Sequence, residues 1–187
     1  AIDLHHLMPQ KVDLKNLTVS ELRDLIGSLG KEGYRTPQLL KWLYSIGVRS
    51  FDEMTNLSKK FREELNQISF ISELFPLRTE EAKDGTKKFL FQLDDGNRIE
   101  SVLIPEKERL TLCISTQAGC AMGCRFCLTG KKGLKRNLTA SEILNQVLPA
   151  RRSLSRDASI TNIVLMGMGE PLANYENNLK ALSLMAC

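Results

Sequence analysis

Three cysteines crowd into one short segment, and this spacing limits what the segment can do. Cys120, Cys124 and Cys127 lie within eight residues, in the stretch "GCAMGCRFCLTG". A structural zinc site closes its tetrahedron with four protein ligands, usually supplied as two separated pairs. Three thiolates in one tight loop instead suit a cubane iron–sulfur cluster, with the fourth iron left open for an exogenous ligand. The spacing therefore predicts a cluster that also takes a substrate or a cofactor.

Composition sets the broad class of the protein. The chain has 187 residues, of which 42% are hydrophobic, enough to bury a core in one domain or two small ones. Its apolar runs are far shorter than the roughly 20 residues of a membrane span, and residues 1–20 lack the apolar centre of a signal peptide. We therefore expect a cytoplasmic protein without a membrane partner. In that reducing compartment, clustered cysteines serve as metal ligands or redox groups rather than as disulfides.

Positive charge is concentrated in the cysteine half of the chain. Residues 1–105 carry 15 basic and 16 acidic side chains, whereas residues 106–187 carry 11 and 6. Between Arg125 and Arg156, eight basic residues stand against one acid, Glu142. This asymmetry indicates a polyanionic partner near the cysteine loop. On charge alone, a solvated basic face is an equally good interpretation.

Helical periodicity dominates the N-terminal part. Apolar residues spaced three and four apart predict three helices, packed as a small bundle over residues 1–75. The first begins at a capping box formed by Thr18 and Glu21. The second has Thr36 as its N-cap, followed by proline in the first turn, and ends at Gly47. The third carries Leu57, Phe61, Leu65 and Ile68.

From Asp84 the pattern changes to alternation. The segments "KKFLFQL" and "RIESVLIP" flank "DDGN", which predicts a hairpin. A strand at "LTLCIST" leads into the cysteine loop. A second capping box, Thr139 with Glu142, opens a helix that should run to about Leu154 and bend at Pro149. The β-branched run "ITNIVLM" then predicts a parallel strand covered on both faces.

The second half therefore reads strand, loop, helix, strand, loop, helix, which is the start of a parallel α/β layout. A complete (β/α)8 barrel takes about 250 residues. We accordingly expect an α/β fold in which residues 1–83 form a helical accessory domain. Residues 84–187 would hold the hairpin and the first β/α units of a barrel that is cut short.

The cysteine spacing C-x-x-x-C-x-x-C, with Phe126 before the last cysteine, resembles the signature of radical S-adenosylmethionine (radical SAM) enzymes. The resemblance implies that the three cysteines hold a [4Fe-4S] cluster. It also implies that S-adenosyl-L-methionine chelates the open iron and, on one-electron reduction, releases a 5′-deoxyadenosyl radical. "GMGEPL", after the second predicted strand, resembles the segment that holds the methionyl amino group, which implies cofactor-binding roles for Gly169 and Glu170.

Six segments in order resemble the radical SAM dual-specificity RNA methyltransferases, which methylate C2 of an adenine. They are "YRTPQLLKWLY", "FDEMTNLSKKFR", "DGTKKFLF", "IESVLIPE", "TLCISTQAGCAMGCRFCLTG" and "ITNIVLMGMGEPLANYENNL", and the resemblance spans about residues 18–182. It implies two RNA partners: 23S rRNA at the peptidyl transferase centre, and tRNA at the adenine next to the anticodon. It further implies a monomer that receives electrons from a donor such as flavodoxin. A relative that methylates C8 of the same ribosomal adenine, and confers antibiotic resistance, remains an alternative.

The resemblance also implies roles for two residues of the predicted strands. In the family, one cofactor methylates a cysteine, the radical from a second activates that methyl group for addition to adenine, and another cysteine resolves the adduct by forming a disulfide. Cys113 matches the resolving cysteine and Glu100 the proton acceptor. Judged by sequence alone, they are a buried strand thiol and an ordinary strand carboxylate.

The chain departs from the family at its C-terminal end. The methyl-carrying cysteine of the family lies well beyond position 187, and Cys187 does not match it. We therefore expect that the chain as given lacks the carrier and does not complete turnover alone.

The helical part resembles the family's accessory domain for RNA. RNA would approach over Lys59, Lys60 and Arg62 and over the basic loop after Cys127, where phosphate contacts give salt-dependent affinity. The target adenine would have to leave its stack to reach the cluster.

A rival from another class is a non-enzymatic RNA-binding module with a four-thiolate zinc site. Its ligands would be Cys113, Cys120, Cys124 and Cys127. Bound metal separates the two hypotheses, because zinc favours the module whereas iron with sulfide favours the enzyme.

Overall fold

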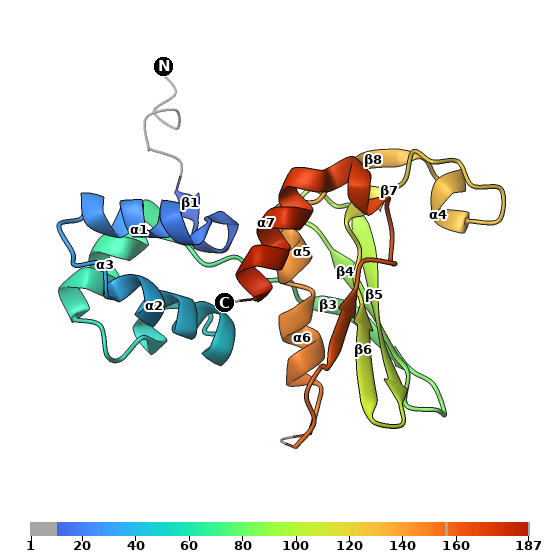
Figure 1. The fold of residues 1–187 in the computed structure, drawn as a ribbon, viewed down its shortest axis with the longest axis horizontal. Coiled ribbons are helices and arrows are strands. Elements are labelled where there is room, and N and C mark those ends of the chain that lie inside the picture. Colours follow the sequence, from blue (N-terminus) through green and yellow to red (C-terminus); the bar gives the residue numbers. More distant parts are fainter. Residues whose placement is uncertain (1–10, 156, 187) are drawn as a thin grey trace, which may run out of the picture. The chain divides into compact units, whose positions relative to one another are not determined.

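The computed structural model describes residues 11–155 and 157–186 (Figure 1). The chain divides into two compact units between Ser72 and Glu73. This division precedes the boundary expected at residue 83, because the segment after Glu73 already contributes a strand to the sheet of the second unit. The first unit is mainly helical and the second combines a sheet with helices.

The helical unit packs its elements around one apolar core. Its helices are α1 (Val19–Ser28), α2 (Arg35–Leu40), the π-helical turn η3 (Lys41–Ile46) and α3 (Lys59–Ile68), with short 3-10 turns at η2 (Leu14–Asn16) and η4 (Phe51–Glu53). Strands β1 (Val12–Asp13) and β2 (Ser69–Phe70) pair in parallel. Fully buried side chains from all three α-helices, among them Ile26, Leu39 and Leu65, fill the core.

The predicted helices of this unit are confirmed, with one correction at a boundary. Thr18 and Glu21 form the expected capping box at the start of α1. Gly47 ends the second helical segment in the left-handed conformation, at φ 76°. The prediction that Thr36 is an N-cap was wrong. Its N–H already donates to the Gly33 carbonyl at 3.1 Å, and its side chain is buried, so Thr36 lies inside the first turn of α2.

A sheet organises the second unit. Among the described residues, five strands are ordered β3-β4-β5-β6-β9. Their bounds are β3 (Pro76–Glu81), β4 (Lys87–Gln92), β5 (Arg98–Glu106), β6 (Arg109–Cys113) and β9 (Asn162–Val164). Neighbours from β3 to β6 are antiparallel, whereas β6 and β9 are parallel. The hairpin predicted around "DDGN" is thus confirmed as β4 and β5.

Helices cover one face of this sheet (Figure 1). They are α5 (Ala140–Leu144), α6 (Val147–Arg152) and α7 (Tyr175–Met185), and their buried alanines and isoleucine share a core with the sheet. Along β5, the residues Ile99, Ser101 and Leu103 are buried and alternate with half-exposed ones. Because successive strand residues face opposite sides, Glu100 and Val102 lie on the other face.

Two expectations for this unit were wrong. The helix predicted to bend at Pro149 is two helices, α5 and α6, and the break lies earlier, at Asn145 and Gln146. The fully buried Gln146 amide bonds the Ser101 hydroxyl and the Ser115 backbone, which fixes the chain at that point. Proline is tolerated in the first turn of the following helix because its missing N–H has no partner there.

Strand β9 is also less covered than predicted. Ile163 and Val164 are only half-buried, so the strand is not enclosed on both faces by the described part of the chain. Within the same described residues, no helix is long and apolar enough to cross a membrane.

An ion-pair network ties the tip of the β4–β5 hairpin to the rest of the unit. Arg136 bonds both carboxylate oxygens of Glu142 at 2.8 Å and also contacts the Asp95 carboxylate in the hairpin turn. Arg136 lies on β8 (Leu134–Asn137), and Glu142 lies in the first turn of α5, where it completes the capping box with Thr139. The guanidinium, followed by the Asn97 backbone N–H, lowers the pKa of Asp95 to about 2.

This network predicts an acid-dependent stability. A carboxylate with a depressed pKa stabilises the fold above its ordinary pKa, and this contribution is lost as pH falls toward the folded-state value. Asp95→Asn should therefore lower the free energy of unfolding by up to about 1 kcal/mol near neutral pH, since the pair is partly exposed. The difference from the wild type should shrink between about pH 4 and pH 2. Chemical denaturation across this range measures it.

Asp94→Asn, at the exposed neighbouring position, is the matched control and should not change the acid dependence. Parallel stability curves for the wild type and Asp95→Asn at every pH would contradict the assigned role of the ion pair.

Candidate functional site

The cysteine loop leaves the sheet just beyond β6 and is closed at its base by two short strands. Strand β7 (Gln117–Gly119) precedes the loop, helix α4 (Leu128–Lys131) lies within it, and β8 returns antiparallel to β7. At Gly119, φ is 82° and an added Cβ would lie 2.0 Å from the Gly133 carbonyl oxygen. Only glycine fits this close approach. The two ends of the loop therefore lie in close backbone contact just before Cys120.

The structure places the three cysteines along this loop at different depths. Cys120 is buried and its N–H donates to the Gly133 carbonyl at 3.2 Å. Cys127 is half-buried and Cys124 is exposed, and all three thiols are free. Within residues 11–155 and 157–186, no group of three or more His, Cys, Asp or Glu side chains is arranged to hold a metal ion. The cysteines share one loop, but in the described part of the chain they do not form such a group.

The chemistry of the loop nevertheless suits thiolate ligands. The Gly130 backbone N–H donates toward the Cys127 sulfur and, with help from Thr129, lowers the pKa of this thiol below its ordinary value. Thiolate is the form that binds metals. Three cysteine donors in one solvent-reached loop, one of them already biased toward thiolate, fit an iron–sulfur cluster.

The "GMGE" turn, residues 167–170, follows β9 and packs on the segment that leads into the cysteine loop. The Met168 carbonyl accepts from the N–H groups of Thr116 and Gln117, at 2.8 and 3.1 Å. Gly169 has φ 106°, and an added Cβ would lie 2.6 Å from the Gln117 Cβ. Because β6 and β9 are parallel, their following loops meet at the same sheet edge. The two segments expected to hold a cofactor are thus in direct contact.

Glu170 lies at the end of this turn and is half-buried. One carboxylate oxygen accepts from the Leu172 N–H at 3.1 Å and caps the 3-10 turn η5 (Pro171–Asn174). The Glu170 N–H donates to the Gln117 side chain at 2.9 Å. The carboxylate is therefore held in place by the backbone beside the cysteine loop.

Glu100 and Cys113 lie on the same face of the sheet, opposite the helices. Val102 of β5 pairs with Cys113, so the alternation that exposes Glu100 and Val102 also places Cys113 on that face. The Glu100 carboxylate is 3.6 Å from the Lys88 ammonium and is 44% exposed. Burial raises the pKa of the Cys113 thiol, which the Met166 N–H partly offsets. Cys113 therefore belongs to the strand and not to the cysteine loop.

Several residues that position the site were not identified from the sequence. The Ser115 hydroxyl donates to the Glu100 carbonyl at 2.6 Å and accepts from the Met168 N–H at 2.9 Å. The amide side chains of Gln117, Asn137 and Asn174 join the residues that flank the cysteine loop to the "GMGE" turn and to η5. The sequence held one signal for these residues. The polar run "STQ" comes at the end of a predicted strand, and polar side chains that are buried must find hydrogen-bond partners.

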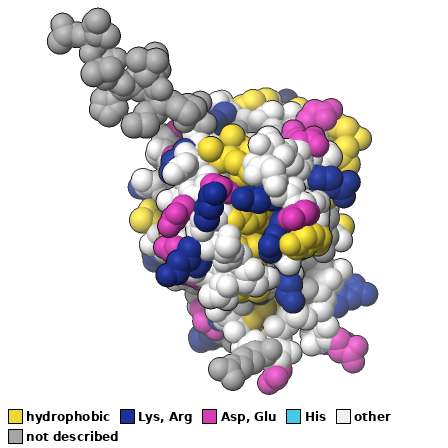
Figure 2. Space-filling view, turned by 90° about the vertical axis from the view of Figure 1, so that its left-hand side faces the viewer, with side chains coloured by type: hydrophobic (Ala, Val, Ile, Leu, Met, Phe, Trp, Pro, Cys, Tyr) yellow, Lys and Arg dark blue, Asp and Glu magenta, His cyan; other side chains and the backbone are white. Residues whose placement is uncertain are grey.

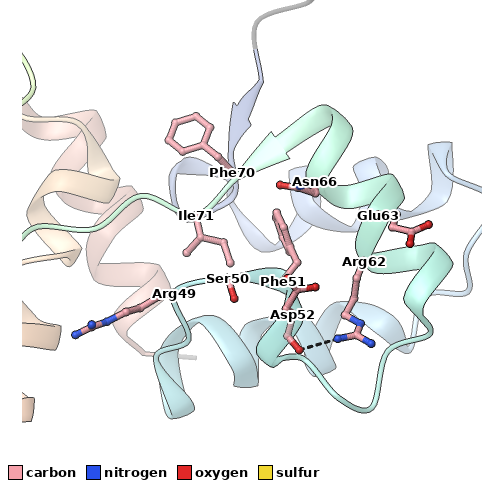
Figure 3. Close-up of a pocket in the computed structure, with 9 residues that line it drawn as sticks. All are labelled: Arg49, Ser50, Phe51, Asp52, Arg62, Glu63, Asn66, Phe70 and Ile71. Atoms are coloured by element: carbon pink, nitrogen blue, oxygen red, sulfur yellow. Dashed lines mark hydrogen bonds between the residues drawn. The ribbon is translucent and has the colours of Figure 1, made fainter.

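The helical unit has a separate cavity of about 370 Å³ (Figure 3). Its lining combines two arginines, Arg49 and Arg62, with Asp52 and Glu63, so the formal charges cancel. The half-exposed ring of Phe70 stands at its rim. This balance does not favour a dedicated phosphate site.

The basic residues expected to face RNA in this unit differ in their exposure and in their hydrogen bonds. Lys59 and Lys60 are exposed at the start of α3. Arg62 is half-buried and donates to the Asp52 carbonyl at 2.6 Å (Figure 3). In Figure 2, Lys and Arg side chains are interspersed with Asp and Glu rather than gathered in one basic patch.

Comparisons with known proteins agree with this architecture. Residues 12–71 match the family model described as the ribosomal RNA large subunit methyltransferase N-terminal domain. A crystal structure of a radical SAM methyltransferase from Sphaerobacter thermophilus aligns with a TM-score of 0.86 and 40% identity, over 94% of this chain and 52% of that one.

Curated relatives carry the name dual-specificity RNA methyltransferase RlmN. The protein of Geotalea uraniireducens is 54% identical over 94% of this chain and 50% of its own length. That of Geobacter sulfurreducens is 52% identical over 95% of this chain and 48% of its own length. The chain thus spans about half the length of the curated relatives it matches.

The chain is thus similar in fold and in sequence, over most of its length, to a radical SAM methyltransferase of known structure. Over the aligned residues the chain is similar to these RlmN proteins, and its helical unit matches the model of the ribosomal RNA large subunit methyltransferase N-terminal domain.

The close contact at Gly169 leads to a stability prediction. Gly169→Ala should lower the free energy of unfolding by about 2 kcal/mol or more, because a Cβ at positive φ is strained and here also meets Gln117. Gly96→Ala is the matched control, since Gly96 has φ 80° with open space around it. Thermal and chemical unfolding of both variants separates the collision from the backbone strain. Equal losses in the two variants would show that the contact with Gln117 is unimportant.

Proposed function

We propose that this chain is the first part of a radical SAM RNA methyltransferase that acts on C2 of an adenine in 23S rRNA and in tRNA. The observation that carries the proposal is the direct packing of the "GMGE" turn against the base of the cysteine loop, at one sheet edge. That edge, beyond the carboxyl ends of parallel strands, is where open α/β folds bind ligands.

In this proposal, Cys120, Cys124 and Cys127 hold a [4Fe-4S] cluster, and Gly169 and Glu170 bind S-adenosyl-L-methionine. The cluster, when bound, supplies the electron that cleaves the cofactor to a radical. The protein contributes the thiolate bias at Cys127 and a turn whose backbone comes close to a ligand without a side chain in the way. The Glu170 carboxylate, held by its own capping bond, accepts from the cofactor's ammonium group.

Glu100 and Cys113 act on the substrate side. Both are placed on the sheet face opposite the helices, and Glu100 is exposed enough to reach a ligand. We assign Glu100 as the acceptor of the adenine C2 proton. We assign Cys113 as the thiol that would resolve the RNA adduct: it would form a disulfide with the methyl-carrying cysteine, beyond position 187 in the family, as the bond between that cysteine's sulfur and the transferred carbon breaks. Its raised pKa keeps it protonated until a base is available.

The RNA partner would be bound mainly through phosphates. Lys131, Lys132 and Lys135 are exposed on the cysteine loop and its return strand, and Lys59 and Lys60 are exposed on α3. In this proposal the helical unit serves as the RNA-binding accessory domain. The enzyme would work as a monomer with an external electron donor such as flavodoxin.

The alternatives have less support. A four-thiolate zinc module needs Cys113 beside the loop cysteines, yet Cys113 is a strand residue paired with Val102. The name that the relatives carry favours dual-specificity methylation over a C8-specific resistance enzyme.

Cysteine substitutions test the ligand assignment. Anaerobic reconstitution should load about four irons per chain in the wild type. Replacement of Cys120, Cys124 or Cys127 by alanine should abolish this iron content, while Cys113→Ala is the matched control and should retain it. Iron and sulfide analysis with visible absorption provides the measurement. Equal loss of metal in all four variants, with zinc as the bound metal, would support the module instead.

Salt dependence tests the RNA surface. Lys131→Gln combined with Lys132→Gln and Lys135→Gln should weaken binding of a structured RNA about tenfold or more at low salt. It should also reduce the slope of log affinity against log salt by about 0.7 to 0.9 per lost phosphate contact. Lys83→Gln with Lys107→Gln, at exposed hairpin positions, should leave the slope unchanged. An unchanged slope in the triple variant would remove the loop from the RNA interface.

A further inference from the structure

Gln117 lies between the two segments of the proposed cofactor site. Its side chain is 1% exposed. The side-chain oxygen accepts from the Glu170 N–H at 2.9 Å, and the side-chain nitrogen donates to the Asn137 side-chain oxygen at 2.7 Å. One buried amide thus joins the "GMGE" turn to β8, the strand that returns from the cysteine loop.

The side-chain amides of Asn137 and Asn174 also join these two parts of the chain. Asn174 of η5 donates to the carbonyls of Thr116 and Leu138, both at 2.8 Å. Asn137 donates in the opposite direction, to the Ala173 carbonyl at 3.3 Å. These contacts link the chain on both sides of the cysteine loop to the residues just after Pro171, whereas Gln117 links it to Glu170, just before Pro171. They lie outside the ladder that pairs β6 with β9.

Gln117 is the central member of this group for a chemical reason. Its position requires an acceptor on one side and a donor on the other, and glutamine supplies both. Gly169 lies directly against it, because an added Cβ there would be 2.7 Å from the Gln117 backbone nitrogen. Separation of the two segments would leave buried amide groups unpaired, which is costly.

We propose that Gln117 is a positioning residue that locks the cysteine loop and the "GMGE" turn into one frame. This rests on the proposed function, in which the cysteine loop holds the cluster and the "GMGE" turn binds S-adenosyl-L-methionine. The fixed separation lets the protein bind S-adenosyl-L-methionine without first ordering either segment. Loss of Gln117 therefore weakens cofactor binding while the three thiolate ligands remain.

Gln117→Met tests the lock, because methionine has a similar length and lacks the two amide hydrogen bonds. Gln92→Met, at an exposed position of β4, is the matched control. Amide hydrogen exchange by NMR on the metal-free protein reads the coupling directly. The Glu170 amide, which loses its acceptor, and the Cys120 amide, which bonds across the loop base, should both exchange about tenfold faster in Gln117→Met. Faster exchange at Glu170 alone would show a purely local hydrogen bond and overturn the proposal.

Asn137→Leu removes the partner on the other side of Gln117. The double variant with Gln117→Met should show no further increase in Cys120 exchange, because both substitutions break the same link. Additive effects would show that the two side chains act separately, and this too would overturn the proposal.

Cofactor titration gives the second readout. After reconstitution, the EPR signal of the reduced cluster in Gln117→Met should match that of the wild type, and its change on adding S-adenosyl-L-methionine should need about tenfold more cofactor. Equal cofactor affinity in Gln117→Met and Gln92→Met would overturn the lock and leave the proposed function standing. If the wild-type chain holds no cluster, the proposed site fails instead, and the exchange experiment alone decides the role of Gln117.

Discussion

The site depends on one backbone carbonyl. Met168 accepts from two successive N–H groups, those of Thr116 and Gln117, where the chain turns from the sheet toward the cysteine loop. This shared acceptor continues the pairing of β6 with β9 past the end of the ladder, after the bond from Ile114 to the Val164 carbonyl. The cysteine loop therefore begins from a backbone already fixed to the glycine turn.

The parallel pairing of β6 and β9 makes this meeting possible. Antiparallel neighbours would send their following loops to opposite edges, whereas parallel strands send them to the same edge. The crossover through α5 and α6 buries one sheet face and leaves the other with Glu100 and Cys113. One face of the sheet is thus packed against helices, and the other face carries the two residues that we propose act on the substrate. The helical unit has a core of its own, so its proposed role in RNA binding is independent of this arrangement.

Much of this could be predicted from the sequence. The hairpin around "DDGN", the capping boxes at Thr18 and Thr139, and the strand before "GMGE" are local patterns, and each is confirmed. The break before α6 could not be predicted, because it depends on Gln146 bonding the Ser115 backbone N–H, 31 positions away, and the Ser101 hydroxyl of β5, 45 positions away. Strands β7 and β8 are likewise fixed by the glycine contact between Gly119 and Gly133 and not by an alternating pattern. The roles assigned to the cysteines, Glu100 and Glu170 remain predictions.

The most direct test of this account is Mössbauer spectroscopy of the chain reconstituted with ⁵⁷Fe, before and after addition of S-adenosyl-L-methionine. Three cysteine ligands and one open iron predict a four-iron cluster in which one site differs from the other three. The spectrum of that single site should change when the cofactor binds. Four equivalent irons that do not respond to the cofactor, or a folded chain that takes up zinc instead, would contradict the account.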